Sequence, residues 1–170
     1  MSLTSRITIA ASAMQTAALD LGSASAQLAK SYMTDLTDGT SAGQANRIFH
    51  DTRTLAASSS EDIDLAGVLT DAFGSTITLA RVKGLIIAAA AANTNNVLVG
   101  GASATQFVSW NGGATHTVTV RPGAVFALVA GSADATGYVT AAGSTDLLKI
   151  ANSSSGTSVT YDIVVIGCSA

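Results

Sequence analysis

The chain has 170 residues and a formal net charge of −3 at pH 7, and only 11% of its residues are charged. An ordinary soluble domain has about 25% charged residues, so acids, bases and metal ligands are scarce and an enzyme is disfavoured. The eight Lys and Arg residues are scattered, and no basic face for nucleic acid is expected. Small apolar and hydroxyl side chains desolvate more cheaply than charged ones. We therefore expect a structural or binding protein that buries broad surfaces against its neighbours.

Neither a targeting segment nor a membrane span is expected. Residues 1–9 lack a charged region followed by a sustained apolar core, which argues against a secretory signal. The longest apolar run, Leu85–Ala92, is far shorter than the ~20 residues that cross a bilayer. The single cysteine, Cys168, excludes an intrachain disulfide, and we expect it to be a small buried residue near the end of the last strand.

The first part of the chain predicts an arm. Arg6–Ala11 alternates, and Tyr32–Leu36 is a candidate partner strand. The segment between them is rich in Ala, Ser and Gln, with few large apolar anchors: Leu19, Leu21 and Leu28. We expect residues 1–46 to be an arm or edge extension that packs on the main domain or on a neighbouring subunit. Residues 37–46, rich in Gly, Asp and Ser, are the expected hinge.

Alternation also marks the start of the main domain. Asp62-Ile63-Asp64-Leu65 predicts a strand whose two carboxylates lie on a solvated face. Ala72-Phe73-Gly74 predicts a turn. The acidic cluster of Glu61, Asp62 and Asp64 lacks the loop register of an EF-hand, so a calcium site is the weaker interpretation.

Residues 75–170 predict strands separated by turns. Ser75–Ala92 predicts one long strand with a bulge near Ala80, where its apolar phase changes, although Ala88–Ala92 also suits a helical turn. Ser158–Gly167 alternates clearly and becomes apolar on both faces toward its end, which predicts a central strand. The other expected strands are Asn96–Gly100, Gln106–Trp110, His116–Val120, Ala124–Ala130 and Asp146–Ala151.

Turn residues separate these strands. Asn111-Gly112-Gly113 predicts a hairpin between Trp110 and His116. Arg121-Pro122-Gly123-Ala124 predicts a type II turn. With no long helix-period pattern among the strands, the chain is expected to be all-β, with residues 47–170 forming an antiparallel β-sandwich or jelly-roll-like domain.

Candidate catalytic groups are sparse. His50 and Asp51 with one of many serines would make a triad on paper, but no G-x-S-x-G is present, and His116 stands alone in a turn region. Two His and one Cys are too few for a protein-only zinc site. Gly100-Gly101 predicts a turn rather than a phosphate loop, because no helix follows it. We expect no catalytic residue, no cofactor and no metal.

Aromatic residues make up only 5% of the chain, so most are needed for a core. A sugar-binding platform would have to be built from Phe107, Trp110 and Tyr138.

Four stretches resemble a group of small bacteriophage virion proteins: Phe49–Ala57, Asp62–Gly74, Val120–Ala130 and Thr160–Gly167. The resemblance covers roughly residues 47–170 and rests on fold-type patterns, so it implies no active site. It implies a virion component, most similar to head decoration or cement proteins. These are small β-rich subunits that bind the outside of an assembled capsid, often as trimers.

Together with this resemblance, the composition predicts a capsid decoration protein. We expect it to be made in the host cytoplasm and to lie on the head exterior of the phage particle. Its expected partners are the major capsid protein and further copies of itself, as a homotrimer, with neither nucleic acid nor membrane. The alternative is a tail-associated or receptor-binding module whose loops around Asn93, Asn111 and Asn152 recognise a host glycan. A hydrolase that depends on His50 is the third class.

Overall fold

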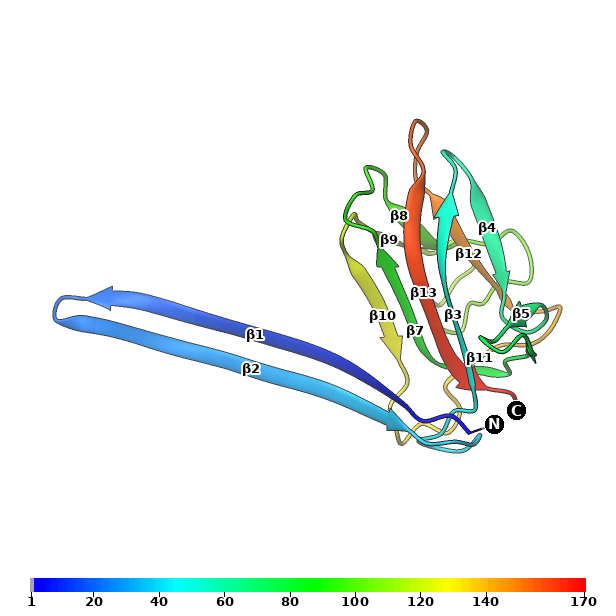
Figure 1. Ribbon diagram of the computed structural model, residues 1–170, viewed down its shortest axis with the longest axis horizontal. Helices are drawn as coiled ribbons and strands as arrows, with labels where there is room; N and C mark the ends of the chain where they lie inside the picture. The colour runs from blue at the N-terminus through cyan, green and yellow to red at the C-terminus, as the bar shows by residue number, and fades with distance from the viewer. Residues whose placement is uncertain (1) are drawn as a thin grey trace.

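The computed structural model describes residues 2–170 and divides them into two parts. Strands β1 (Ser5–Leu19) and β2 (Gly22–Leu36) form a long hairpin that projects from the rest of the molecule (Figure 1). The later strands form a β-sandwich, and within residues 2–170 there is no helix. The expected all-β sandwich with an N-terminal arm is confirmed.

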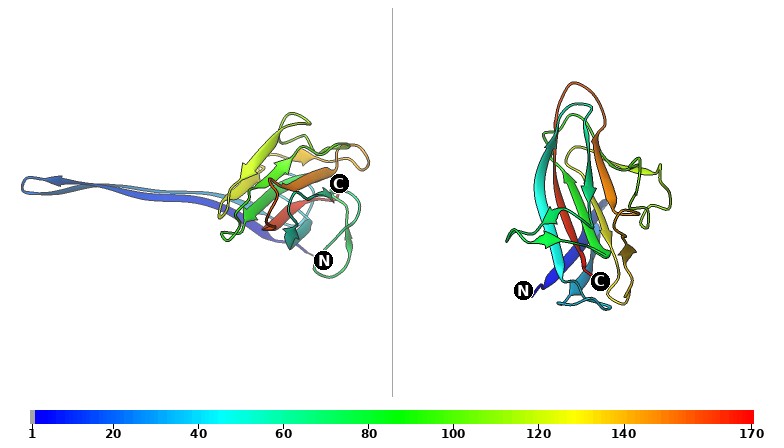
Figure 2. Two further views of the ribbon diagram at one scale, coloured as in Figure 1. Left: turned by 90° about the horizontal axis from the view of Figure 1, so that it is seen from above. Right: turned by 90° about the vertical axis from the view of Figure 1, so that its right-hand side faces the viewer.

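The sandwich has two antiparallel layers, seen edge-on in Figure 2. The first sheet has the order β10 (Val125–Val129), β7 (Arg81–Ala89), β13 (Val159–Cys168) and β3 (Arg47–Leu55), and short β11 (Tyr138–Val139) also pairs with β7. The second has the order β4 (Ser60–Asp64), β12 (Leu147–Asn152), β8 (Val97–Gly100) and β9 (Thr117–Val120). β5 (Leu69–Thr70) and β6 (Thr76–Ile77) form a small separate hairpin.

The core fills the space between the two sheets. Alternate residues of β13 point inward, and Tyr161 and Ile163 have no exposed surface. From the facing sheet, Ile150 and Val99 are equally buried. Each such side chain contributes about 1.5–3 kcal/mol. The sandwich therefore has a hydrophobic core to which the hairpin adds nothing beyond its base.

β13 is the central strand, as predicted, because it pairs with β3 on one side and β7 on the other. The predicted two-sided burial toward its end is also confirmed. Ile166 points away from the core, but Ile7 and Leu36 at the base of the hairpin cover it.

The single long strand predicted over Ser75–Ala92 is wrong. The segment contains β6, a break at residues 78–80, and β7, and it leaves the sheet after Ala89. The bulge lies at Lys83 rather than near Ala80, since the β13 register skips that residue. Lys83 is buried and its Nζ donates a hydrogen bond to the carbonyl of Asp134 (2.5 Å), which holds it out of the ladder.

The strand predicted over Gln106–Trp110 is also wrong. Only Gln106 makes a bridge, to Leu147, and Trp110 turns back so that its Nε1 donates to the carbonyl of Phe107 (2.8 Å). Asn111-Gly112-Gly113 therefore lies in a loop and joins no hairpin. The tight turn at Arg121–Ala124 is confirmed, with Gly123 at φ +74° and the Ala124 amide 2.9 Å from the Arg121 carbonyl.

The segment predicted as a hinge, residues 37–46, is a hydrogen-bonded loop. The Thr37 amide donates to the Gly43 carbonyl, and the Ala45 amide donates to the Thr37 carbonyl. The amide of Asn46 donates to Gly167 at the end of β13, and Ala45 is fully buried. These contacts favour a fixed exit of the hairpin from the sandwich over a flexible one.

Candidate interaction surface

The hairpin has two chemically different faces. β1 and β2 pair over their whole length, from Ser5 opposite Leu36 to Leu19 opposite Gly22. Because side chains alternate across a strand, the odd residues of β1 share a face with the even residues of β2. This apolar face carries four exposed large side chains, Ile9, Leu19, Leu28 and Tyr32, and five alanines, Ala11, Ala13, Ala17, Ala24 and Ala26.

The opposite face of the hairpin is polar. It consists largely of Ser, Thr and Gln, with Met14 and Met33 as its large apolar side chains. At its base, Arg6 donates to Asp35 with Nε 2.5 Å from Oδ1. The guanidinium hydrogen bond lowers the pKa of the Asp35 carboxyl. We call this side the hydroxyl face.

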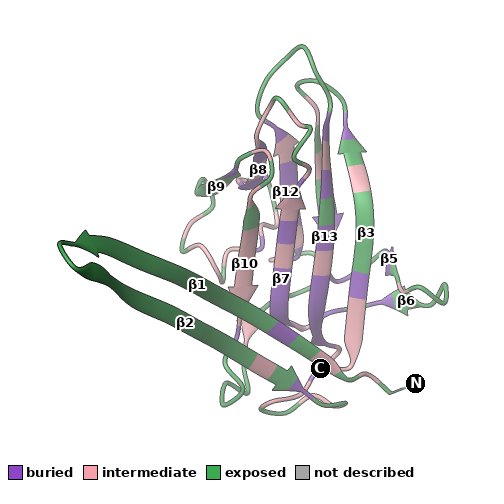
Figure 3. Cartoon of the chain, turned by 60° about the vertical axis from the view of Figure 1, so that its left-hand side comes forward, coloured by how far each residue is buried: buried purple, intermediate pink, exposed green. Residues whose placement is uncertain are grey.

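Only the base of the hairpin is covered by the sandwich. Ile7 is buried over Gly84, where a β-carbon would collide with its Cδ1, and Leu36 is buried beside Ile166. Beyond this point both strands are exposed, as the long green part of the hairpin in Figure 3 shows. A two-stranded hairpin alone in water is marginally stable, and most of this hairpin has no cover from the sandwich.

The outward side of the first sheet is a second uncovered surface, which we call the outer face. Near the base of the hairpin, partly buried Ile48, Ile86, Val129 and Val164 pack against the cluster formed by Ile7, Leu36, Ala45 and Ile166. Farther from the base, the apolar residues of this face are Ala88, Ala127 and exposed Val125. Polar residues continue it along β3 and β13: His50, Thr52, Thr54, Thr160 and Asp162. In Figure 3 the base of the hairpin crosses the lower ends of β7 and β13, and nothing covers the upper part of this sheet on its outward side.

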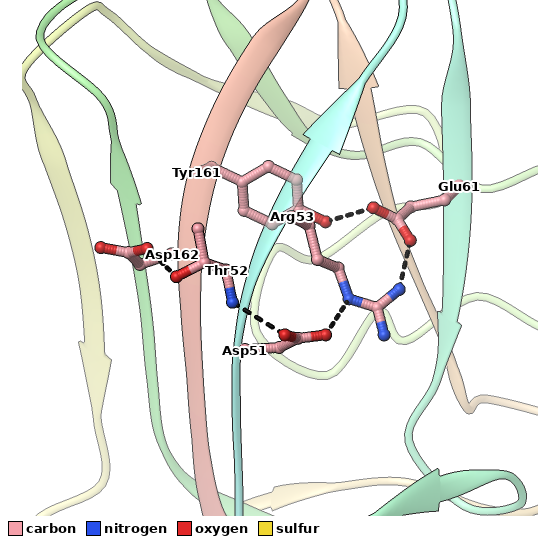
Figure 4. Close-up of polar contacts among 6 residues, drawn as sticks. All are labelled: Asp51, Thr52, Arg53, Glu61, Tyr161 and Asp162. Atoms are coloured by element: carbon pink, nitrogen blue, oxygen red, sulfur yellow. Dashed lines mark hydrogen bonds and ion pairs between the residues drawn. The ribbon is translucent and has the colours of Figure 1, made fainter.

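A polar network closes the edge of the core between β3 and β4 (Figure 4). Tyr161 donates its hydroxyl to Glu61 (2.6 Å), and Arg53 bridges Glu61 and Asp51. Burial, followed by the hydrogen bond to Glu61, raises the pKa of the Tyr161 hydroxyl. Such a phenol is neutral and holds its proton, and its hydrogen bond to Glu61 ties the two sheets together.

The catalytic triad considered for His50 and Asp51 does not assemble. The two residues are neighbours on β3, so their side chains point to opposite faces of the sheet. His50 is exposed on the outer face, while Asp51 accepts from Arg53 Nε (3.1 Å). His116 is exposed and its Nδ1 lies 2.8 Å from the carbonyl of Asn111.

The acidic cluster adopts the predicted arrangement on β4. Ile63 and Leu65 are buried, Asp62 is exposed, and Asp64 accepts from the Ala66 amide. Over residues 2–170, no three His, Cys, Asp or Glu side chains gather in a way that would hold a metal ion. In the same residues no helix is long and apolar enough to cross a bilayer.

The aromatic candidates pack in or against the core of the sandwich, and the asparagine candidates make hydrogen bonds at its loops. Phe107 is buried, and Trp110 packs on Phe126 with ring centroids 5.5 Å apart. Asn93 donates to the Thr160 carbonyl, and Asn152 donates to two loop carbonyls. These amides stabilise their own loops, which leaves them less available to a glycan.

Two surface cavities lie beside β3. The larger, about 410 Å³, is lined by Leu3, Ile48 and Phe73 among others, and its Asp71 carboxylate already accepts the amides of Phe73 and Ser75. The smaller, about 210 Å³, lies against Asp51 and Arg53. Asp71, Asp51 and Arg53 each make hydrogen bonds within the chain.

Cys168 is buried at the end of β13, as predicted. Its Sγ lies 3.4 Å from the carbonyl of Gln44, and burial raises the pKa of the thiol. A neutral, covered thiol is unreactive.

Comparison of the chain with protein-family models, with curated proteins and with solved structures finds no match in any of the three.

Sequence reasoning missed the continuous apolar face of the hairpin. The sequence shows Leu19, Leu21 and Leu28 as isolated apolar residues. Only the strand register, which places Leu28 opposite Ala13 and Tyr32 opposite Ile9, shows that these paired residues belong to one apolar face. The usable signal is a period of two that continues through both segments, in which alanine fills most of the apolar positions and conceals the pattern.

Proposed function

We propose that this chain is a structural subunit of a bacteriophage particle, a decoration protein that binds the major capsid protein on the head exterior as a homotrimer. The observation that carries the proposal is the hairpin, which leaves a self-sufficient sandwich and holds large apolar side chains in water. Scarce charge and the resemblance of residues 47–170 to small virion proteins support the same role.

The physical basis of such a role is linkage. A protein that binds only the assembled shell stabilises it by mass action, as a ligand stabilises a native state. Many copies on one shell add their contributions, and multiple weak contacts act together. An arm that reaches past its own sandwich suits this work because it can engage a neighbouring subunit.

The test is co-sedimentation with capsids that lack this protein. We compare the full chain with a short-hairpin variant in which Asn-Gly replaces residues 12–29 between the paired residues Ala11 and Lys30. The full chain is expected to sediment with the shells and raise their disruption temperature, and the variant to do neither. Equal binding of both proteins would contradict the proposal.

A labelled full chain on intact particles tests the tail-associated alternative. Electron microscopy is expected to show label over the head. Label confined to the tail tip would replace the decoration role by the receptor-binding one.

A further inference from the structure

We propose that the apolar face of the hairpin of one copy packs on the outer face of a second copy of this chain. This inference deepens the proposed function and rests on it for the setting in the particle, although its test uses the free protein. It names the partner of the hairpin.

The base of the hairpin already shows that the two surfaces fit. Ile7 belongs to the apolar face, and it packs on the lower end of the outer face over Gly84 and beside Ile166. The next apolar residues along the hairpin, Ile9 and Tyr32, continue the same face without a cover. Within one chain the contact stops there, because the hairpin leads away from the sheet (Figure 3).

The dimensions of the two surfaces are compatible. Two strands make a ribbon about 10 Å wide, and four strands make a face about 20 Å wide. The uncovered part of the hairpin, about eleven residues per strand, is ~37 Å long at ~3.4 Å per residue. It therefore spans strands of the length of β7, β13 and β3, and leaves its tip beyond them.

The charges on the two surfaces are complementary. Lys30 is the one charged side chain on the apolar face of the described hairpin strands, and its Nζ lies over the Tyr32 ring. Among the outer-face residues of the described sheet, Asp162 is the one carboxylate, and it is exposed beside Thr52. This cation and this anion would set the register of a contact whose other side chains are mainly small apolar and hydroxyl groups.

A second copy is the occupant that these observations favour, because both uncovered surfaces belong to the same chain. The contact joins two different patches, so it is heterologous, and repetition closes it into a ring when the rotation permits. Closure at three copies would give the proposed homotrimer. A capsid protein as the occupant of the apolar face is a distinct outcome of the test.

The test measures the mass of the full chain in solution, without capsids, by light scattering and sedimentation over a concentration series. The wild-type protein is expected to be oligomeric. Leu28→Asp, on the apolar face, is expected to give monomers, whereas Met14→Asp, somewhat more exposed and on the hydroxyl face, is expected to keep the wild-type mass. A monomeric wild type, or identical behaviour of the two variants, overturns the inference.

Charge reversal tests the register. Lys30→Asp and Asp162→Lys are each expected to weaken association at least about tenfold. The double variant is expected to recover most of that loss, because the ion pair is restored with the opposite polarity. Failure of the double variant to recover overturns the pairing of these two surfaces.

Capsid binding by the same variants separates the two proposals. If Leu28→Asp stays oligomeric but no longer sediments with capsids, the apolar face binds a capsid protein; this inference is then wrong and the proposed function stands. If Leu28→Asp is monomeric and the wild-type oligomer does not bind capsids, the self-association stands and the decoration role is wrong.

Discussion

The hairpin and the sandwich are built from similar residues but are stabilised differently. In β13, alternate side chains such as Ile163 are sealed between two sheets of the same chain. In β1 the same alternation leaves Ile9 nearly half exposed, because the hairpin has no second layer. The same alternation therefore gives a closed core where a second sheet faces it, and an exposed apolar face where none does.

Amide hydrogen exchange should show the largest difference between the two regions. In dilute monomeric protein, amides of residues 11–30 are expected to exchange at least about 100-fold faster than those of β13, because a lone hairpin opens at little cost. Raising the concentration until the protein associates should slow the hairpin amides and leave β13 unchanged. Hairpin amides as slow as those of β13 in the monomer would contradict this division.

Large-to-small substitutions sharpen the comparison at the level of stability. Ile163→Ala is expected to lower the free energy of unfolding by about 2–5 kcal/mol, because it leaves a cavity in the closed core. Ile9→Ala in the monomer should cost under about 0.5 kcal/mol, as expected for an exposed site. Urea unfolding measures both, and similar losses would mean that the hairpin is part of the folding unit.

The polar network at the edge of the sandwich should have an intermediate effect. Tyr161→Phe removes the hydrogen bond to Glu61 and is expected to cost about 1–2 kcal/mol, while Arg53 keeps the carboxylate paired. Thr54→Val, which removes an exposed hydroxyl contact with Thr160, is the matched control and should be nearly neutral. A neutral Tyr161→Phe would show that the network does not join the sheets.

The smallest expected effect is on the pKa values of two carboxyl groups, one in the hairpin and one in the sandwich. A hydrogen bond from Arg6 lowers the pKa of Asp35 in the hairpin, and the backbone amides of Gly137 and Thr136 lower that of Asp134 in the sandwich. Each carboxylate stabilises the folded state at pH values above its pKa in the unfolded chain. That contribution is lost as the pH falls through the lower pKa that the group has in the folded state.

Salt distinguishes the two causes. About 1 M salt screens exposed charges, so the pKa of Asp35 should rise toward its ordinary value while that of Asp134 stays low. Arg6→Gln should raise only the pKa of Asp35. Titration followed by NMR measures both values, and a salt-insensitive Asp35 would contradict the assignment to Arg6.

Much of the sandwich could be predicted from the sequence because its burial is encoded locally. β13, β4 and the turn at Arg121–Ala124 follow from alternation and turn residues. The strand predicted over Gln106–Trp110 was wrong because this segment is a loop. Phe107 is buried although it lies in that loop, so the apolar pattern of the segment resembles that of a strand. The Lys83 bulge depends on the distant carbonyl of Asp134, which no local pattern encodes.

The candidate surface was harder to predict than the fold. An arm was expected, but its chemical faces depend on which residues of β1 and β2 lie opposite each other, and that register is a long-range property. The outer face was equally hidden, since residues such as Ile86 and Val164 look like core residues until the sheet order is known.

Gly84 lies under the base of the hairpin, where the hairpin leaves the sheet. Ile7 rests in the space that a side chain at position 84 would fill, so this contact helps to fix the angle at which the hairpin leaves the sheet. A strand of fifteen residues extends ~50 Å, and a tilt of about 10° at such a pivot moves the far end by ~9 Å. A methyl group at position 84 would displace Ile7, and a small tilt at that contact would be magnified along the arm.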